Sequence, residues 1–257
     1  EGLTLRGVPD AGPVAEALAD AVDALRLGGV EAELDGGECR IPHATPAVPE
    51  TPDLPLDADL AAYLLALPAF AGGSVRLTGR LGDDPAAAAL RQGFADAGLT
   101  LVEEPDAVNG APGKLTERLT TDMGRCPELA PLALALSLKA EDGGDLALPD
   151  DADQRQAALD FLDALHVPCE EHGGRLRVRP ERPSMDSPWT APGPWHALGL
   201  ALAAYVRPGL ALENPGELTG LWPRFWNFYN SLPEGLFEPR DKDDDDHDTP
   251  KRRRIRV

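Results

Sequence analysis

One element recurs three times in the sequence, and this repeat limits the folds that the chain can adopt. In each copy an apolar run with helical spacing ends at glycine or proline-glycine, and a short strand-like run follows at once. The copies cover residues 59–78, 128–148 and 196–212, about 65 to 71 residues apart. That period is longer than the usual solenoid periods, so a stack of short repeats does not fit.

A second helix-to-strand element alternates with the first. Its apolar positions have the spacing of one helix face over 14–27, 86–97 and 154–165, and a strand is expected after each. In the first and third copies that strand turns through glycine into another short strand, at 39–41 and 175–178, which is typical of a hairpin. The sequence therefore predicts an α/β fold of repeated β-α-β-α-β-β units, the first of which lacks its opening part.

Composition and charge exclude several classes of partner. The chain has 257 residues, of which 42% are hydrophobic, enough to bury a core. No apolar run reaches the roughly 20 residues that cross a bilayer, and the first residues lack the basic and apolar regions of a signal peptide. A net charge of −20 repels nucleic acid and anionic membranes. We expect a cytoplasmic protein that binds neither.

The residue types that hold metals or cofactors form no recognisable motif. Cys39, Cys126 and Cys169 lie far apart, so neither a disulfide framework nor a zinc site is indicated. The five histidines are scattered, and the sequence has no dinucleotide fingerprint, P-loop or His-Glu-x-x-His run. We predict reduced thiols, no metal and no cofactor.

Proline and charge suggest where the chain divides. Four prolines within 45–55 favour an extended linker, so a domain crossover is expected near residue 57. The tail, 237–257, joins an acidic run to a basic run without apolar periodicity and is predicted to be disordered. Its basic end is interpreted as a solvated tail rather than a nucleic-acid patch, because acids lie beside it.

Three segments carry a family resemblance. Residues 57–66 read Asp-Ala-Asp-Leu-Ala-Ala-Tyr-Leu-Leu-Ala, and residues 123–131 read Met-Gly-Arg-Cys-Pro-Glu-Leu-Ala-Pro. Residues 213–226 open on Glu-Asn-Pro and close on Leu-Trp-Pro-Arg-Phe-Trp. In order and spacing they resemble the enolpyruvyl transferases, specifically the 5-enolpyruvylshikimate-3-phosphate (EPSP) synthases. The match extends over about residues 1–235 and corresponds to the later half of a family member.

The resemblance implies an inside-out α/β fold with two domains of three units each. Residues 1–50 would be the last unit of the first domain, and 57–236 the C-terminal domain. Family members close on shikimate-3-phosphate and phosphoenolpyruvate, and helix N-termini facing the ligands suit such anions. The remaining units would come from a missing N-terminal half or a partner subunit.

The resemblance also assigns a catalytic carboxylate. Enolpyruvyl transfer needs an acid/base near the transferred proton and cations around two phosphates. Glu128, directly after Pro127, matches the catalytic Asp of the family. The alternative is an acid in the first helical turn behind an N1 proline, which the helix dipole favours without any catalysis.

Three further candidates lie at residues 150–155, where 150–154 match the family's Lys-Glu-Thr-Asp-Arg run. Asp151 replaces the Glu as a second catalytic candidate, Asp153 is kept as a substrate-binding residue, and Arg155 stands one position beyond the family's Arg. The family's Lys is an acid here and its Arg a Gln. The alternative is an acidic N-cap region for the helix 154–165.

His196 is the last substrate-binding candidate, because it falls in the family's Asp-His-Arg position. It could supply a proton-dependent charge, or it could simply pack beside Trp195 at the start of a helix. The family's late Lys falls at Gly220. Replacing a cation that would bind a phosphate in this way costs about 1.5 to 3 kcal/mol for each charge-assisted hydrogen bond.

Three functions remain open. The first is transfer of enolpyruvyl from phosphoenolpyruvate to shikimate-3-phosphate, a carboxyvinyl transferase step of the shikimate pathway of aromatic amino acid biosynthesis, with Glu128 as the base. The second is a non-catalytic relative that keeps the fold as a binding or structural subunit. The third is a related enolpyruvyl transferase that acts on a nucleotide sugar.

Overall fold

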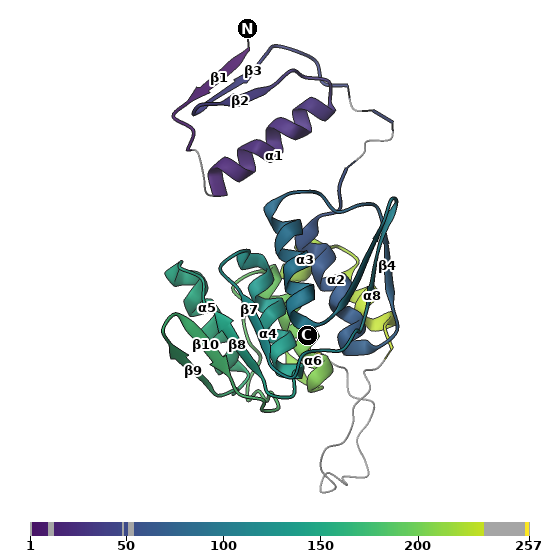
Figure 1. The fold of residues 1–257 in the computed structure, drawn as a ribbon, viewed down its shortest axis with the longest axis vertical. Helices are drawn as coiled ribbons and strands as arrows, with labels where there is room; N and C mark the ends of the chain where they lie inside the picture. The colour runs from purple at the N-terminus through teal and green to yellow at the C-terminus, as the bar shows by residue number, and fades with distance from the viewer. Residues whose placement is uncertain (1, 10–12, 48, 51–53, 234–254, 257) are drawn as a thin grey trace, which may run out of the picture. The chain divides into compact units, whose positions relative to one another are not determined.

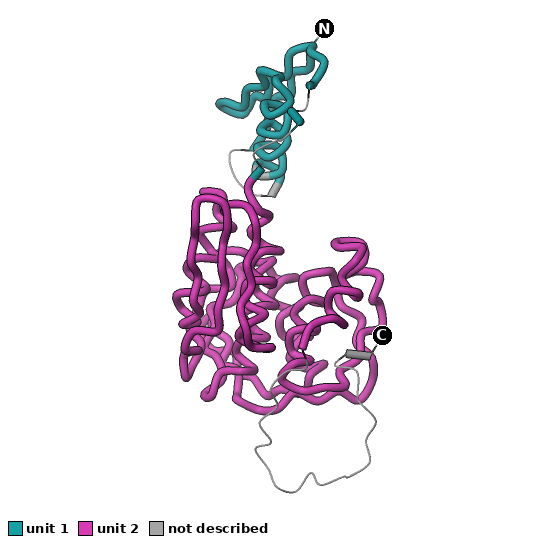
Figure 2. Tube along the Cα trace, turned by 90° about the vertical axis from the view of Figure 1, so that its right-hand side faces the viewer, with its two compact units in different colours: residues 1–54 teal, residues 55–257 magenta. Residues whose placement is uncertain are grey.

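The computed structural model describes residues 2–9, 13–47, 49–50, 54–233 and 255–256. The chain divides into two compact units, 1–54 and 55–257 (Figure 2). The tail predicted to be disordered, 237–257, lies outside the described residues apart from Ile255 and Arg256. No helix in the described part of the chain is long and apolar enough to cross a membrane.

Unit 1 is one β-α-β-β repeat with a small core. Its antiparallel sheet has the order β1-β3-β2. The core is formed by Val22, Ala32 and Cys39, which are almost fully buried. The elements of unit 1 are β1 (Leu3–Arg6), α1 (Pro13–Leu27), β2 (Glu33–Asp35) and β3 (Glu38–Ile41).

Unit 2 begins with helix α2, which is followed by a second β-α-β-β repeat. Its antiparallel sheet has the order β4-β6-β5, which is the order found in unit 1. Strand β6 was not predicted from the sequence. The elements are α2 (Ala58–Ala71), β4 (Val75–Thr78), α3 (Pro85–Ala97), β5 (Thr100–Glu104) and β6 (Ala107–Ala111).

The middle of unit 2 is a complete β-α-β-α-β-β unit, as the sequence predicts. Its sheet has the order β7-β8-β10-β9, in which β7 runs parallel to β8 and the other pairs are antiparallel. The elements are β7 (Leu119–Asp122), the 3-10 turn η1 (Pro127–Leu129), α4 (Ala130–Lys139), β8 (Gly144–Ala147), α5 (Ala152–Ala164), β9 (Cys169–His172) and β10 (Arg175–Val178).

The last part of unit 2 closes the core with helices. Strand β12 pairs parallel with β11, so Ile255 and Arg256 differ from the disorder predicted for the tail. The elements are α6 (Pro194–Val206), β11 (Leu210–Ala211), α7 (Gly216–Leu221), α8 (Phe225–Ser231) and β12 (Ile255–Arg256).

The helices α2, α4 and α6 form the centre of unit 2, with sheets on the outside (Figure 1). Most side chains of these helices are buried, which explains why each helix is apolar around most of its circumference. Helix α6 packs closely on α4 at Gly199, where a Cβ atom would lie 2.8 Å from the Cβ of Pro131. The inside-out arrangement therefore follows from three apolar helices that can be covered only by each other and by the amphipathic faces around them.

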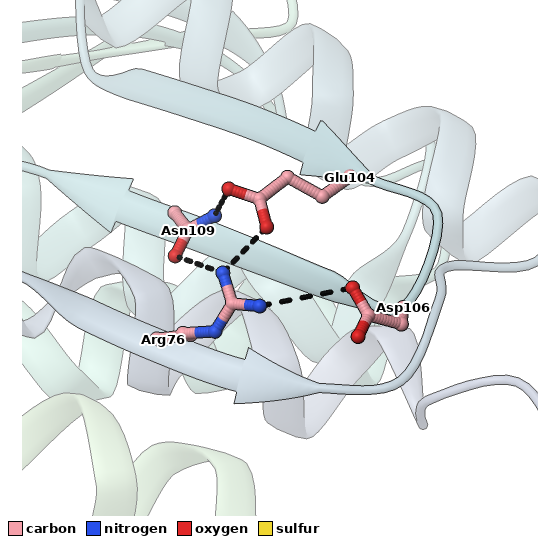
Figure 3. A network of polar contacts seen from close by, with 4 residues as sticks. All are labelled: Arg76, Glu104, Asp106 and Asn109. Atoms are coloured by element: carbon pink, nitrogen blue, oxygen red, sulfur yellow. Dashed lines mark hydrogen bonds and ion pairs between the residues drawn. The ribbon is translucent and has the colours of Figure 1, made fainter.

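The outer face of the sheet β4-β6-β5 carries a polar network (Figure 3). Arg76 on β4 lies with its Nη1 atom 2.6 Å from Oε2 of Glu104 and its Nη2 atom 3.7 Å from Oδ1 of Asp106. Asn109 on β6 accepts from Nη1 of Arg76 at 3.4 Å and donates to Oε1 of Glu104 at 3.0 Å. This network is exposed, so it marks the solvent side of the sheet and adds little stability.

Candidate active site

The second turn of α2, the 3-10 turn η1 before α4 and the first turn of α6 are joined through one tyrosine. The hydroxyl of Tyr63 on α2 donates to the backbone oxygen of Glu128 at 2.7 Å, which ties α2 to the turn before α4. The ring of Tyr63 stacks on Trp195 in the first turn of α6, with 5.7 Å between the centroids. Tyr63 therefore joins α2, the turn η1 that holds Glu128, and the first turn of α6.

A thiol and two carboxyl groups lie together at this meeting point, and we call Asp59, Cys126 and Glu128 the carboxyl cluster. The Sγ atom of Cys126 is 3.2 Å from Oδ1 of Asp59 and 3.5 Å from Oε2 of Glu128. Cys126 is buried, and the two acids are half-buried. Neither acid forms an ion pair with any residue that the structure describes.

Burial governs the protonation of the carboxyl cluster. Desolvation raises the pKa of Asp59, and the negative charges of Glu128, Asp57 and Asp84 raise it further against the opposing effect of the Cys126 thiol. Desolvation and the two neighbouring carboxyls raise the pKa of Cys126 far above its usual range. The thiol is therefore protonated at neutral pH and is a poor nucleophile.

The carboxyl cluster is also the group of described residues that could hold a metal ion. Its three ligand atoms lie within 4.8 Å of one another. One thiolate and two carboxylates are a donor set that Zn²⁺ accepts. The sequence predicts no metal, and that expectation stays a prediction.

Asp151, the second catalytic candidate, caps helix α5. Its Oδ1 atom accepts a hydrogen bond from the backbone N–H of Gln154 at 2.9 Å. Asp153 lies exposed in the first turn of the same helix. The two acids therefore lie where an acidic N-cap region would place them, which is the alternative that the sequence offered for this segment.

Arg155 binds other parts of this chain. Its Nη1 atom lies 3.7 Å from Oε1 of Glu171, and its Nη2 atom donates to the backbone oxygen of Pro149 at 3.4 Å. Its Nε atom is buried without a hydrogen-bond partner among the described residues. The guanidinium is therefore only partly available to an anionic ligand.

His196 packs among aromatic rings in the first turn of α6. Its ring centroid is 6.4 Å from that of Trp189 and 6.5 Å from that of Phe161. Burial lowers the pKa of His196 to about 4. The imidazole is therefore uncharged at neutral pH and cannot offer a cation to a phosphate.

Among the described residues, Glu128 is the one predicted site residue that contacts the carboxyl cluster partners Asp59 and Cys126. Glu128 contacts Asp59, Cys126 and Tyr63, whereas none of the hydrogen bonds and ion pairs of the described residues joins it to the other four candidates. Asp59 and Cys126 were not predicted as partners of Glu128. The available signal was that Asp59 and Glu128 occupy the first turn of equivalent helices in the repeat.

Comparison with known proteins gives partial matches in sequence. No family model matches the chain. The 3-phosphoshikimate 1-carboxyvinyltransferase of Bordetella petrii is 28% identical over 195 residues, which cover 70% of this chain and 43% of that protein. The enzyme of the same name from Bordetella avium is 26% identical over 193 residues, which cover 68% of this chain and 43% of that protein. The chain thus spans less than half the length of these curated relatives.

Solved structures match over most of the chain. EPSP synthase from Acinetobacter baumannii has a TM-score of 0.57 at 14% identity, covering 91% of this chain and 57% of that one. The enolpyruvyl transferase NikO from Streptomyces tendae has a TM-score of 0.57 at 21% identity, covering 90% of this chain and 55% of that one. The predicted α/β fold and the predicted resemblance to the C-terminal half of EPSP synthase are confirmed.

Proposed function

We propose that this chain supplies the acid/base half of an enolpyruvyl transferase site, which transfers a carboxyvinyl group from phosphoenolpyruvate to a hydroxyl of shikimate-3-phosphate. The observation that supports this most directly is the position of Glu128 in η1, half-buried beside Cys126 and tied to α2 through the hydroxyl of Tyr63. Likeness to EPSP synthases, in sequence and in fold, gives the reaction class.

In this reaction the acceptor hydroxyl gives up its proton to a base as its oxygen bonds to the substituted enol carbon, and a proton is added to the methylene carbon. The C–O bond to phosphate then breaks as a proton is removed from the new methyl group, which restores the double bond. Glu128 is the group we assign to proton transfer, because a carboxyl in a half-buried position can give and take a proton.

The other candidates take lesser roles in this proposal. We assign Asp151 to holding the start of α5 in place, since its carboxylate already serves the backbone. Asp153, which is exposed, is available to accept a hydrogen bond from a substrate hydroxyl. Arg155 would bind a phosphate only by giving up Glu171. The remaining phosphate contacts would come from a part of the enzyme beyond this chain.

A second candidate function is a non-catalytic relative that keeps the fold for binding. One specific observation favours it: the positions that the family resemblance assigns to phosphate binding offer little free positive charge. His196 is uncharged at neutral pH because burial lowers its pKa to about 4. The α5 start presents Asp151 and Asp153, which repel anions.

The test is calorimetric titration of shikimate-3-phosphate, with and without phosphoenolpyruvate, into this chain and into the longest natural protein that contains it, combined with a phosphate-release assay. We expect binding and phosphate release from the longer protein. Glu128→Gln should then lower turnover by about 10² to 10⁴-fold, the usual contribution of acid/base catalysis. Glu117→Gln, at an exposed glutamate, is the matched control.

The two candidate functions give different outcomes. Binding without phosphate release, unchanged in Glu128→Gln, would favour the non-catalytic relative. No binding by either protein at millimolar ligand and low salt would overturn the transferase proposal.

A further inference from the structure

The carboxyl cluster joins two kinds of metal ligand from segments that lie far apart in the sequence. Asp59 belongs to the first turn of α2, whereas Cys126 and Glu128 belong to the turn before α4. A thiol and two carboxyl groups, with no ion-paired cation among the described residues, are donors whose charge a divalent cation would balance. The 67 residues between Asp59 and Cys126 explain why the sequence alone gives no metal motif here.

The spacing of the three ligand atoms suits a tetrahedral zinc ion. With Zn–S bonds of about 2.3 Å and Zn–O bonds of about 2.1 Å, a sulfur and an oxygen on one tetrahedral ion lie about 3.6 Å apart. Sγ of Cys126 lies 3.2 Å from Oδ1 of Asp59 and 3.5 Å from Oε2 of Glu128, and all three atoms lie within 4.8 Å of one another. One ion can therefore reach all three atoms with only small side-chain movements.

The backbone that carries the three ligands is already fixed. Asp57 caps the start of α2. In the turn before α4, the N–H of Leu129 donates to the backbone oxygen of Cys126 at 3.0 Å, and the hydroxyl of Tyr63 holds the backbone oxygen of Glu128 at 2.7 Å. Ligands held in this way lose little conformational freedom when an ion binds.

The surroundings of the carboxyl cluster favour a cation over an anion. The negative charges of Asp57 and Asp84 both act on Asp59. The guanidinium nearest in sequence, that of Arg125, lies 3.4 Å from Oδ2 of Asp122 instead. The two acids of the cluster are only half-buried, which leaves an ion a way in and a fourth position facing solvent. The sulfur ligand favours Zn²⁺ over Mg²⁺, which prefers oxygen alone.

We propose that Asp59, Cys126 and Glu128 bind one Zn²⁺ ion, with the fourth ligand position open to solvent. When the ion binds, the thiol proton of Cys126 passes to solvent and the sulfur bonds to the metal as a thiolate, with no change of oxidation state. The ion then occupies Oε2 of Glu128, so this carboxyl group cannot transfer a proton while zinc is bound. That inhibitory effect rests on the function proposed above, whereas zinc binding itself does not.

The first test uses Co²⁺ as a spectroscopic substitute for Zn²⁺ in the whole chain. One equivalent of Co²⁺ should produce a thiolate-to-metal charge-transfer band and the strong visible bands of a tetrahedral ion. One equivalent of Zn²⁺ should remove both, and excess Mg²⁺ should remove neither. Cys126→Ser should abolish the charge-transfer band, whereas Cys169→Ser, at the half-buried cysteine on β9, should leave it unchanged.

The second test measures the two carboxyl ligands by calorimetric titration with Zn²⁺. Asp59→Asn and Glu128→Gln each remove one ligand while keeping the shape of the side chain. Each should lower the zinc affinity by at least the roughly 10 to 100-fold that loss of an outer-shell partner costs. Asp160→Asn, at an exposed acid on α5, should leave the affinity unchanged. Circular dichroism establishes that each variant has folded.

Three results would overturn the zinc site: no charge-transfer band at millimolar Co²⁺, a band that survives Cys126→Ser, or a zinc affinity that neither carboxyl variant lowers. Both tests need no substrate, so they are independent of phosphate release. Zinc binding that leaves phosphate release by the longer protein unchanged would overturn the inhibitory effect and the role of Glu128 in proton transfer. Zinc binding with no phosphate release under any condition would overturn the transferase proposal and leave the zinc site standing.

Discussion

The same tripeptide, Asp-Ala-Asp, begins two helices of unit 2 and is used in two different ways. At α5, Asp151 caps the helix and Asp153 is exposed to solvent. At α2, Asp57 caps the helix by accepting from the N–H of Leu60 at 3.0 Å, but Asp59 is half-buried against Cys126. The first acid satisfies the backbone in both places. What the second acid does depends on whether another helix start packs over it.

The packing also separates the two regions in their response to acid. Near α2, burial raises the pKa of Asp59, so protonation at low pH relieves an unfavourable charge. Beside α5, burial lowers the pKa of His196 to about 4, so protonation there creates a buried charge. Acid should therefore weaken the α5 side of the unit first.

The largest expected effect is a loss of stability through His196 on acidification. A histidine whose folded pKa of about 4 lies below its unfolded value contributes its full stability above pH 6.5 and loses it as the pH falls toward 4. The wild type should lose roughly 2 to 3 kcal/mol of unfolding free energy through this group between pH 7 and pH 4.5. Denaturant unfolding of the wild type and His196→Gln at both pH values measures it.

The difference between the two proteins is what counts, since carboxylates titrate over the same range in both. His196→Gln should show a much smaller loss of stability between the two pH values. An equal loss in both proteins would mean that His196 does not carry this pH dependence.

The next effect concerns the hydroxyl that holds Glu128 in place. Tyr63→Phe keeps the ring stacked on Trp195 but leaves the backbone oxygen of Glu128 without its buried donor, at a cost of about 1 to 2 kcal/mol. Tyr229→Phe is a matched control, because the Tyr229 hydroxyl donates to the backbone oxygen of Ala201 in the same way.

Both variants should lower the unfolding free energy by similar amounts in denaturant titrations. Only Tyr63→Phe should also speed alkylation of Cys126, measured by mass spectrometry against Cys169 in the same sample. Equal alkylation of Cys126 in both variants would show that Tyr63 does not hold the carboxyl cluster.

The architecture could be predicted from the sequence because it depends on periodicity. The three central helices recur as apolar runs, and their strands follow at regular intervals. Strand β6 was missed because Asn109 and Gly110 interrupt its apolar pattern. The structure explains the glycine: a Cβ atom at Gly110 would lie 2.4 Å from the backbone oxygen of Leu65 on α2. A close approach to a helix 45 residues earlier in the chain leaves no local signal.

The candidate site was predictable only in part, for a related reason. Glu128 could be found through family resemblance, since it follows a proline at a recognisable helix start. Asp59 could not be separated from Asp153 by any local rule, because the residues around them are the same tripeptide. Their difference arises from tertiary packing, which places Cys126 and Glu128 beside one helix start and solvent beside the other.

The smallest expected effect concerns the helix cap at the start of α5. Asp151→Ala removes the acceptor for the N–H of Gln154 and should cost about 1 kcal/mol of unfolding free energy. Asp153→Ala, two residues on and exposed, should stay within about 0.5 kcal/mol of the wild type. Thermal unfolding of the two variants at pH 7 measures the difference. If Asp153→Ala were the more destabilising, the second acid of this tripeptide would have a structural role at α5 too, and the contrast with Asp59 would fail.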